Sequence, residues 1–439
     1  MTRRHQGFAL LGAVLALIVA LSATLYLVVA PDQGASAATG VTGGGPHGAS
    51  AAPVSAGSWV GSWAAAPVGG EPGTGTDGPA GRSLRNVVHT SASGTSARVT
   101  LSNLYGRSAL TLTHASVALA AGHDTAAAAP GTMRRLTFGG AVSVVIPAGG
   151  QAVSDAVPLR VPRAADVLVT TYSPTASGPV TYHPRARQIS YVAAGDRTED
   201  AGAAAYTGQT PYWRYVTALD VLSDDSAGTV VAFGDSLTDG VTSTTGANRR
   251  WTDVFAGRLR AGGLRYGVVN EGISGNQVLA DRGGRPPVNE SGVGRFGRDV
   301  LSRPDVQVVV IDLGVNDILR NPALADPDAV VAGLRVLVRA AHGHGIRVVG
   351  ATLMPFQGHA GWTPARERVR EEINERIRSG RVYDAVTDFD KALRDPYAPD
   401  RLRPFYDSGD HLHPNDAGFA RMAEEIDVTD LTDGGSARL

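Results

Sequence analysis

The chain has 439 residues, enough for two or three domains at roughly 100–200 residues each. Its formal net charge is −1 and only 18% of its residues are charged, so it lacks the basic surplus that nucleic-acid binding requires. The absence of cysteine excludes disulfides, thiolate metal sites and a cysteine nucleophile.

An apolar segment near the N-terminus predicts export from the cytoplasm. Arg3 and Arg4 precede an apolar run over residues 8–30, which is longer than the ~7–15 residues of an ordinary signal peptide core and long enough to cross a bilayer. Residues 35–37 read Ala-Ser-Ala, a sequence that suits signal cleavage. Residues 1–33 are therefore expected to be either a cleaved signal peptide or an uncleaved membrane anchor. The protein is expected to be secreted, or tethered to the cell surface by this segment.

The next two segments predict a linker followed by a β-domain. Residues 34–57 are rich in Gly, Ala, Ser and Pro and have no apolar periodicity, as in a flexible linker. Residues 58–225 contain short runs of Val, Thr, Leu and Tyr, separated by turn-forming residues, and they predict a β-sandwich or jelly-roll-like accessory domain. The expected strands cover residues 97–103, 110–119, 141–146, 167–172 and 188–192.

The pattern changes to alternating strands and helices over residues 226–430. Several strands are apolar throughout, which is typical of parallel strands covered on both faces. This alternation predicts an α/β domain with a three-layer α/β/α parallel sheet, and ligands bind such sheets at the carboxyl ends of the strands. The expected strands are residues 229–233, 267–270, 306–313, 347–353 and 381–385, and the expected helices are residues 251–261, 326–342, 363–379 and 415–426.

A candidate nucleophile follows the first strand of this domain. The run Gly-Asp-Ser-Leu-Thr-Asp-Gly places Ser236 at the carboxyl end of residues 229–233. A serine hydroxyl needs a general base to remove its proton before it can attack an acyl group. Because Ser is also a common helix N-cap, this tripeptide alone would be an ordinary strand-to-helix turn.

The sequence Asp-His-Leu-His-Pro near the C-terminus supplies a candidate base. Asp410 precedes His413 by three residues, so its carboxylate can bind one ring nitrogen and leave the other for Ser236. His411 is the rival base, but its position next to Asp410 makes the same contact awkward.

Two further strand ends offer donors for an oxyanion hole. Asn316 follows residues 306–313, and Gly275 follows residues 267–270. An amide side chain and an unshielded backbone N–H are groups that stabilise the negative oxygen formed during acyl transfer.

These four blocks, taken in order, resemble the SGNH/GDSL hydrolase family over residues 230–426. The resemblance implies a flavodoxin-like three-layer sheet, Ser236 as nucleophile, His413 as base and Asp410 as its orienting acid. It also implies oxyanion donors from the Ser236 N–H, the Gly275 N–H and the Asn316 side chain, with no cofactor and no metal. The chain lacks the Gly-x-Ser-x-Gly turn of α/β-hydrolases, which excludes that alternative.

Three short runs in the β-domain, residues 59–63, 98–103 and 181–184, read Trp-Val-Gly-Ser-Trp, Arg-Val-Thr-Leu-Ser-Asn and Thr-Tyr-His-Pro. With them, residues 58–225 resemble, more loosely, the β-domain of secreted bacterial members similar to arylesterases and acylhydrolases found beside xylan-degrading enzymes. We therefore expect an extracytoplasmic serine esterase that cleaves short acyl esters through an acyl-enzyme, above all acetyl groups on carbohydrate, with a small ester or an acylated polysaccharide as substrate. A lipase or arylesterase for longer or aromatic esters is the alternative within the enzyme class. A catalytically silent, carbohydrate-binding surface protein is the alternative outside it. Trp59 and Trp63 could stack on sugar rings, although a core position fits them better.

Overall fold

The computed structural model describes residues 57–321 and 323–431. The predicted leader over residues 1–33, and all but the last residue of the predicted linker over residues 34–57, lie outside the described residues. No helix in the described ranges is long and apolar enough to cross a bilayer.

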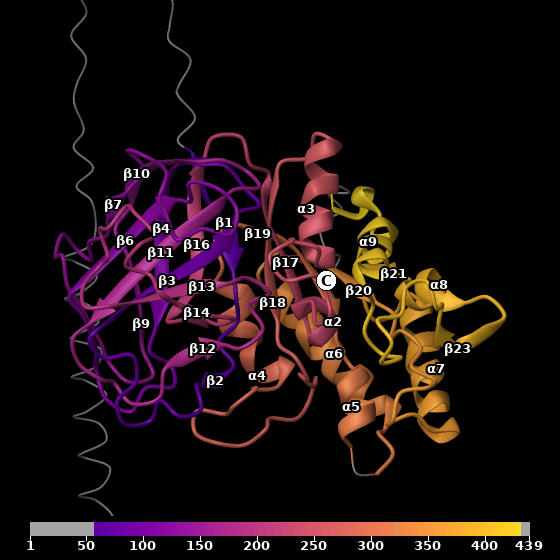
Figure 1. Ribbon diagram of the computed structural model, residues 1–439. Coiled ribbons are helices and arrows are strands. Elements are labelled where there is room, and N and C mark those ends of the chain that lie inside the picture. Colours follow the sequence, from indigo (N-terminus) through magenta and orange to yellow (C-terminus); the bar gives the residue numbers. More distant parts are fainter. Residues whose placement is uncertain (1–56, 322, 432–439) are drawn as a thin grey trace, which may run out of the picture. The chain divides into compact units, whose positions relative to one another are not determined.

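Two antiparallel sheets make up most of the N-terminal half of the described chain (Figure 1). They share one core, in which Leu101 and Leu219 of the first sheet and Val117 and Val169 of the second are fully buried. The predicted β-rich fold of this region is confirmed. The first sheet has the order β1 (Ser58–Ala64), β16 (Val216–Ser223), β4 (Gly94–Ser102) and β10 (Val157–Val161), with β9 (Gln151–Val153) also paired to β4. The second has the order β14 (Gly208–Thr210), β13 (Ser190–Ala194), β3 (Arg82–His89), β11 (Asp166–Ser173), β6 (His114–Leu119) and β7 (Arg134–Arg135).

The single strand predicted over residues 110–119 is wrong. The chain forms β5 (Leu110–Leu112), which pairs with β8 (Val144–Ile146), and then β6, which pairs with β11 of the second sheet. At the break, the Thr113 N–H bonds to the Tyr172 carbonyl. Both halves have the composition of a strand, so the local pattern could not show that they join different sheets.

A small third sheet consists of β2 (Gly69–Gly70), β12 (Thr181–His183) and β15 (Trp213–Arg214). Trp63 lies in the neighbouring core and packs edge-on against Trp213, with ring centroids 4.8 Å apart. Trp63 is therefore unavailable for stacking on a sugar.

The C-terminal half contains a five-stranded parallel sheet with the order second, first, third, fourth, fifth. This is the flavodoxin-like order, and the predicted α/β fold class is confirmed. The strand of this sheet that comes first in the chain, residues 228–234, alternates its side chains between the two faces: Val230 and Ala232 enter one core, and Val231 and Phe233 enter the other. The strands in spatial order are β18 (Tyr266–Gly272), β17 (Gly228–Gly234), β19 (Val306–Asp312), β20 (Arg347–Ala351) and β21 (Ala385–Thr387).

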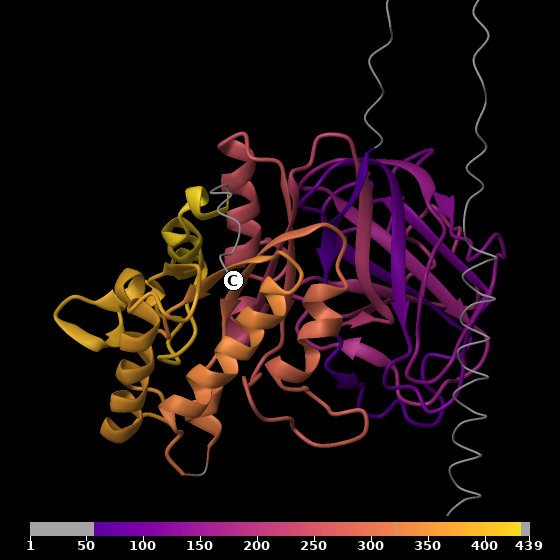
Figure 2. The same cartoon turned by 180° about the vertical axis from the view of Figure 1, so that it is seen from behind.

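Helices cover both faces of the parallel sheet (Figure 2). On one face, Trp251, Phe389 and Phe419 pack together from three helices; on the other, Leu334 and Ile373 pack from two longer ones. The first group consists of α3 (Trp251–Ala261), α8 (Phe389–Leu393) and α9 (Asp416–Glu425), and the second includes α4 (Gly292–Phe296), α6 (Pro327–His342) and α7 (Pro364–Arg378).

The helix boundaries follow the capping signals in the sequence. The Thr363 side chain accepts the Arg366 N–H, and Pro364 occupies the first helical position of α7. Asn415 caps α9 in the same way by accepting the Gly418 N–H. In contrast, the strand predicted over residues 381–385 is wrong, because β21 begins only at Ala385. The apolar residues before Ala385 suggested a strand, but Tyr383 packs in the core without belonging to one.

The antiparallel and parallel parts meet where β1 lies against β17 and β18. The Gly61 N–H donates to Thr229 Oγ1 at 2.9 Å, and the Val268 N–H donates to Ser91 Oγ at 2.9 Å. The backbones approach closely there: a Cβ atom added to Gly267 would overlap the carbonyl oxygen of Gly61. The packing of the two parts therefore depends on glycine at this position.

We expect Gly267→Ala to lower the free energy of unfolding by about 1–3 kcal/mol, because the added methyl group forces β1 away from β18. Denaturant unfolding of wild type and variant measures the change. Gly297→Ala is the matched control, since Gly297 has helical backbone angles and open space around its Cα. Equal stabilities of the two variants would show that the close approach does not matter.

Candidate active site

Three loops that follow adjacent parallel strands meet at one edge of the sheet. Ser236 begins α2 (Ser236–Asp239) after β17, Gly275 lies in the loop after β18, and Asn316 is on α5 (Val315–Arg320) after β19. The strand order reverses between β17 and β19, which is the point where open α/β sheets bind ligands. All three residues line one cleft of about 440 Å³.

Ser236, His413 and Asp410 form a continuous hydrogen-bonded chain. His413 Nε2 lies 2.8 Å from Ser236 Oγ, and His413 Nδ1 lies 2.6 Å from Asp410 Oδ2. This geometry allows His413 to take the serine proton while Asp410 holds the ring in one tautomer. The loop before α9 carries both residues, so the structure brings together the nucleophile and base that the sequence predicted.

Asp410 is suited to support a positive charge on His413. Its Oδ1 accepts the N–H groups of Leu412 and His413 at 3.0 and 2.8 Å. Burial acts to raise the pKa of Asp410, but the hydrogen bonds from His413 outweigh burial and lower it below its ordinary value. The carboxylate therefore stays ionised when His413 is protonated.

His411 is excluded as the base by its own contacts. Its Nδ1 lies 2.7 Å from Asp407 Oδ2, and its ring packs against Gly358. The chain at His411 adopts a left-handed backbone conformation, with φ of 63°, which separates its side chain from that of His413.

Two backbone N–H groups beside Ser236 are free to bind a substrate oxygen. No hydrogen bond within the described residues uses the N–H of Ser236 or of Gly275. Gly275 has φ of +75°, a conformation that favours glycine, and a Cβ atom there would overlap the Arg320 guanidinium. The predicted glycine donor thus lies in the cleft at a position that other residues would strain.

The amide of Asn316 is held in one orientation. Its Nδ2 donates to Asp235 Oδ2 at 3.0 Å, and its Oδ1 accepts from Arg320 Nε at 3.1 Å. Because a guanidinium can only donate, the oxygen must face Arg320, and one hydrogen of Nδ2 remains for a substrate. Sequence reasoning missed Arg320, although its position four residues after Asn316 on a helix was a usable signal.

Buried carboxyl groups lie directly under the nucleophile. Burial, with the nearby Asp312, raises the pKa of Asp235 well above its usual range, and burial raises the pKa of Asp312 to about 7. Asp312 accepts a hydrogen bond from Thr238 on the nucleophile turn. This pair therefore retains a proton well above the pH at which exposed aspartates are ionised.

A residue from the antiparallel part completes the support of the site. His183, at the end of β12, is fully enclosed and lies 3.0 Å through Nε2 from Asp239 Oδ1 and 2.9 Å through Nδ1 from the Ala66 carbonyl. Asp239 ends α2 and also accepts from both the N–H and the hydroxyl of Ser274. His183 thereby fixes the carboxylate that joins the nucleophile turn to the loop carrying Gly275. No local sequence signal connects His183 with Asp239, because the two residues lie in different folding elements.

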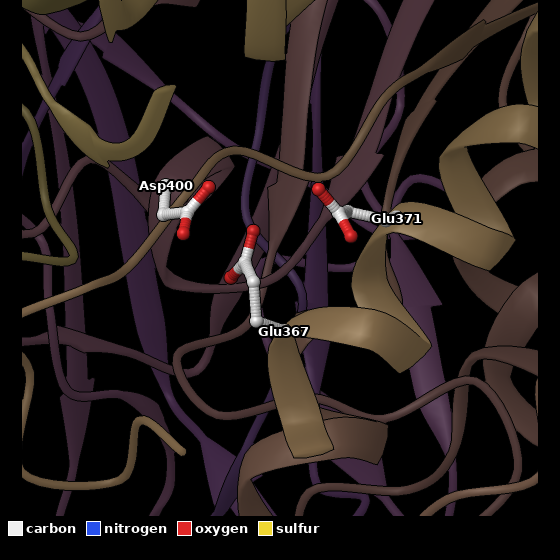
Figure 3. A group of neighbouring side chains, drawn as sticks. All are labelled: Glu367, Glu371 and Asp400. Carbon is white, nitrogen blue, oxygen red and sulfur yellow. The ribbon is translucent and has the colours of Figure 1, made fainter. Parts of the chain in front are cut away.

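Three carboxylates also converge elsewhere, where Glu367 and Glu371 extend from α7 toward Asp400 of β23 (Ala398–Leu402) (Figure 3). Their nearest oxygen atoms lie within 4.8 Å of one another. Glu367 already accepts hydrogen bonds from Arg370 and from the Trp362 indole. Burial raises the pKa of Glu367 despite these bonds. The contacts of Glu367 identify it as part of the packing of α7.

Comparison with known proteins identifies the second half of the chain. The sequence profile of the GDSL-like lipase/acylhydrolase family matches residues 232–421. A comparison with curated proteins gives no significant match. Solved structures that resemble the chain include an acetylxylan esterase from Geobacillus stearothermophilus, with 22% identity, 47% of this chain and 94% of that chain covered, and a TM-score of 0.36. A carbohydrate acetylesterase from Sinorhizobium meliloti matches at 18% identity over 44% and 94% of the two chains, with a TM-score of 0.35. A GDSL-like lipase from Bacteroides thetaiotaomicron matches at 18% identity over 46% and 88%, with a TM-score of 0.34.

The contacts of His183 predict a pH-dependent contribution to stability. Burial acts to lower the pKa of His183, but Asp239 outweighs it and raises the pKa above the ordinary value of roughly 6.5. The charged pair therefore stabilises the fold fully below about pH 6.5, and this stabilisation is lost as the pH rises through the higher folded pKa. Glutamine cannot become charged, so the stability of His183→Gln should not fall with the titration of this pair.

The measurement is the free energy of unfolding from neutral to alkaline pH, taken as the difference between variant and wild type. The exposed His344→Gln serves as control and should keep the wild-type profile. A difference that does not change with pH for His183→Gln would contradict a charged pair.

Proposed function

We propose that this protein removes short acyl groups from carbohydrates through an acyl-enzyme on Ser236. The proposal starts from the family: residues 232–421 form a domain of the GDSL-like lipase/acylhydrolase family, so the protein is a carboxylic ester hydrolase. The observation that carries the proposal is the 2.8 Å contact of Ser236 Oγ with His413 Nε2, next to unused N–H donors. Nucleophile, base and donors lie in one cleft, as acyl transfer requires.

In the first half of the reaction, Ser236 Oγ attacks the ester carbonyl while His413 Nε2 takes the hydroxyl proton. The carbonyl oxygen becomes negative and accepts hydrogen bonds from the N–H groups of Ser236 and Gly275 and from Asn316 Nδ2. The tetrahedral species then collapses: the bond to the alcohol oxygen breaks, and His413 returns its proton to that oxygen. The alcohol leaves, and the acyl group remains on Ser236.

In the second half, water replaces the alcohol. His413 takes a proton from the water as its oxygen attacks the acyl carbon, and the same three donors hold the oxyanion. Collapse of the second tetrahedral species breaks the bond to Ser236 Oγ, which receives the proton from His413. The carboxylic acid is released and the enzyme returns to its starting state.

The composition of the cleft favours a short acyl group on a polar alcohol. Only three of the side chains that line it are large and apolar, namely Val241, Leu319 and Leu412. A long acyl chain needs a continuous apolar surface to replace water, and burial is worth roughly 0.8 kcal/mol for each methylene group. The rest of the lining is polar and suits the hydroxyl groups of a sugar.

We also propose that the enzyme acts outside the cytoplasm. The basic residues Arg3 and Arg4 and the apolar run over residues 8–30 support export. This segment lies outside the described residues, and both a cleaved signal and a membrane tether remain compatible with it. Immunoblotting of culture medium and membrane fractions from producing cells distinguishes them; protein retained in the cytoplasm would contradict the proposal.

The test of activity compares Ser236→Ala with wild type on a series of nitrophenyl esters and on acetylated xylan. We expect the variant to lose turnover by a factor on the order of 10⁴ or more, because no other group replaces the nucleophile. Wild type should prefer acetyl over long-chain esters and release acetate from xylan. Faster cleavage of long or aromatic esters would favour a lipase or arylesterase, and failure of Ser236 to react with a phosphonate probe would favour a silent binding protein.

We expect Asn316→Ala to lower kcat by about 10²–10³ while KM changes much less, because the oxyanion forms only after attack. Steady-state kinetics on nitrophenyl acetate measure both constants. A variant that raises KM and keeps kcat would assign Asn316 to substrate binding instead.

A further inference from the structure

Three arginines from separate segments line the catalytic cleft. Arg185 follows β12 of the antiparallel part, Arg282 lies in the loop after β18, and Arg320 ends α5. The net charge of the whole chain is −1, so this gathering of cations is a local feature of the cleft.

The charges of these arginines are not neutralised by the protein. In the described part of the chain, none of the three forms an ion pair, whereas Arg214, for example, is paired with Glu71. The carboxyl groups closest to the catalytic groups are engaged with other residues: Asp410 with His413, Asp239 with His183, and Asp235, whose pKa is raised by burial, with Asn316. A substrate entering the cleft therefore meets uncompensated positive charge.

The guanidinium groups of Arg282 and Arg320 lie close to each other. A Cβ atom on Gly275 would touch both Arg320 and Arg282, the latter at 3.0 Å from Nη2, so both groups converge over this glycine. Burial lowers the pKa of Arg320, and the charge of Arg282 lowers it further. Like charges held this close repel one another, and an anion between or beside them relieves the repulsion.

The positive surface continues into an adjoining groove of about 580 Å³ that shares Arg185, Ser274 and Arg282 with the cleft. Arg187 lies on this groove, and its Nε is buried with no hydrogen-bond partner in the described structure. Burial lowers the pKa of Arg187, and the charges of Arg250 and Arg185 act in the same direction. Arg187 therefore adds a third arginine to Arg185 and Arg282 on the lining of this groove.

Aromatic rings lie beside these cations. Tyr182 and Tyr212 line the groove and pack edge-on, with ring centroids 5.4 Å apart. Aromatic side chains offer broad apolar faces with a polar tip, which suits the mixed C–H and hydroxyl surface of a sugar ring. Guanidinium groups bind carboxylates through paired hydrogen bonds.

We propose that the natural substrate is an O-acylated acidic glycan, with a sugar carboxylate bound between Arg185 and Arg282 and the acyl ester at Ser236. Neighbouring sugars lie along the groove against Tyr182 and Tyr212. This inference rests on the proposed esterase function and adds the charge of the substrate to it. An anionic phospholipid is the weaker match, because only three large apolar side chains line the cleft at Ser236, where its acyl chain would have to bind.

The test uses O-acetylated galacturonan oligosaccharides in two matched forms, one with free carboxylates and one with the carboxylates converted to amides. We expect kcat/KM for acetate release to be about 10- to 100-fold higher for the charged form, the range that one or two charge-assisted hydrogen bonds produce. Added salt should reduce this preference. In the double variant Arg185→Gln/Arg282→Gln the preference should fall to near one, and thermal unfolding verifies that the variant is folded.

Arg335→Gln is the matched control, since Arg335 is exposed on α6 and lines neither the cleft nor the groove; it should keep the wild-type preference. Equal rates on the two oligosaccharide forms, or a preference that survives in the double variant, would overturn the inference. Faster release of fatty acid from an anionic lysophospholipid than of acetate from the charged glycan would overturn it as well. Nitrophenyl acetate separates the two proposals. If wild type cleaves it but shows no preference for charged glycans, the esterase function stands and only the acidic-glycan inference is overturned. If wild type cannot cleave it, both proposals are overturned.

Discussion

The arrangement of the catalytic groups depends on the place of β17 between β18 and β19 in the parallel sheet. Because β17 is hydrogen-bonded to β18 on one side and to β19 on the other, the loops after all three strands open at the same edge. Those loops carry Ser236, Gly275 and Asn316. The strand order alone therefore brings these three residues together. His413 and Asp410 then come from elsewhere, on the loop before α9.

The antiparallel part contributes residues to the active site. His183 holds Asp239, and Asp239 holds Ser274, so one buried ion pair connects β12 to both the nucleophile turn and the glycine loop. Arg185, two residues after His183, lines the cleft itself. The sequence predicted residues 58–225 to be an accessory domain. In the structure, this segment both holds the nucleophile turn in place and lines the active-site cleft.

Much of the α/β half could be predicted from sequence, since its signals are local. The apolar runs of β17 and β19, the caps at Thr363 and Asn415 and the short motifs around Ser236 and His413 each report the structure that they form. The central strand β3 was not predicted, because it buries Arg85 and Asn86 where an alternating apolar pattern would be expected. Arg85 donates hydrogen bonds to Thr170 and to three carbonyl groups and lies over the ring of Tyr206, and all of these partners are remote in sequence. The role of His183 was hidden for the same reason: its partners are known only once the fold has assembled.

The pairing of β1 with β16 has a consequence for the order in which the chain can assemble. These are the first and last long strands of the antiparallel part, and their register joins Ser58 to Ser223. Both strands precede β17 in the chain and therefore leave the ribosome before it, so this part can begin to close its sheets during synthesis. The surface of β1 and the side chain of His183 are then in place when the first parallel strand emerges. On this route, the half of the chain without the nucleophile is made first and guides the half that contains it.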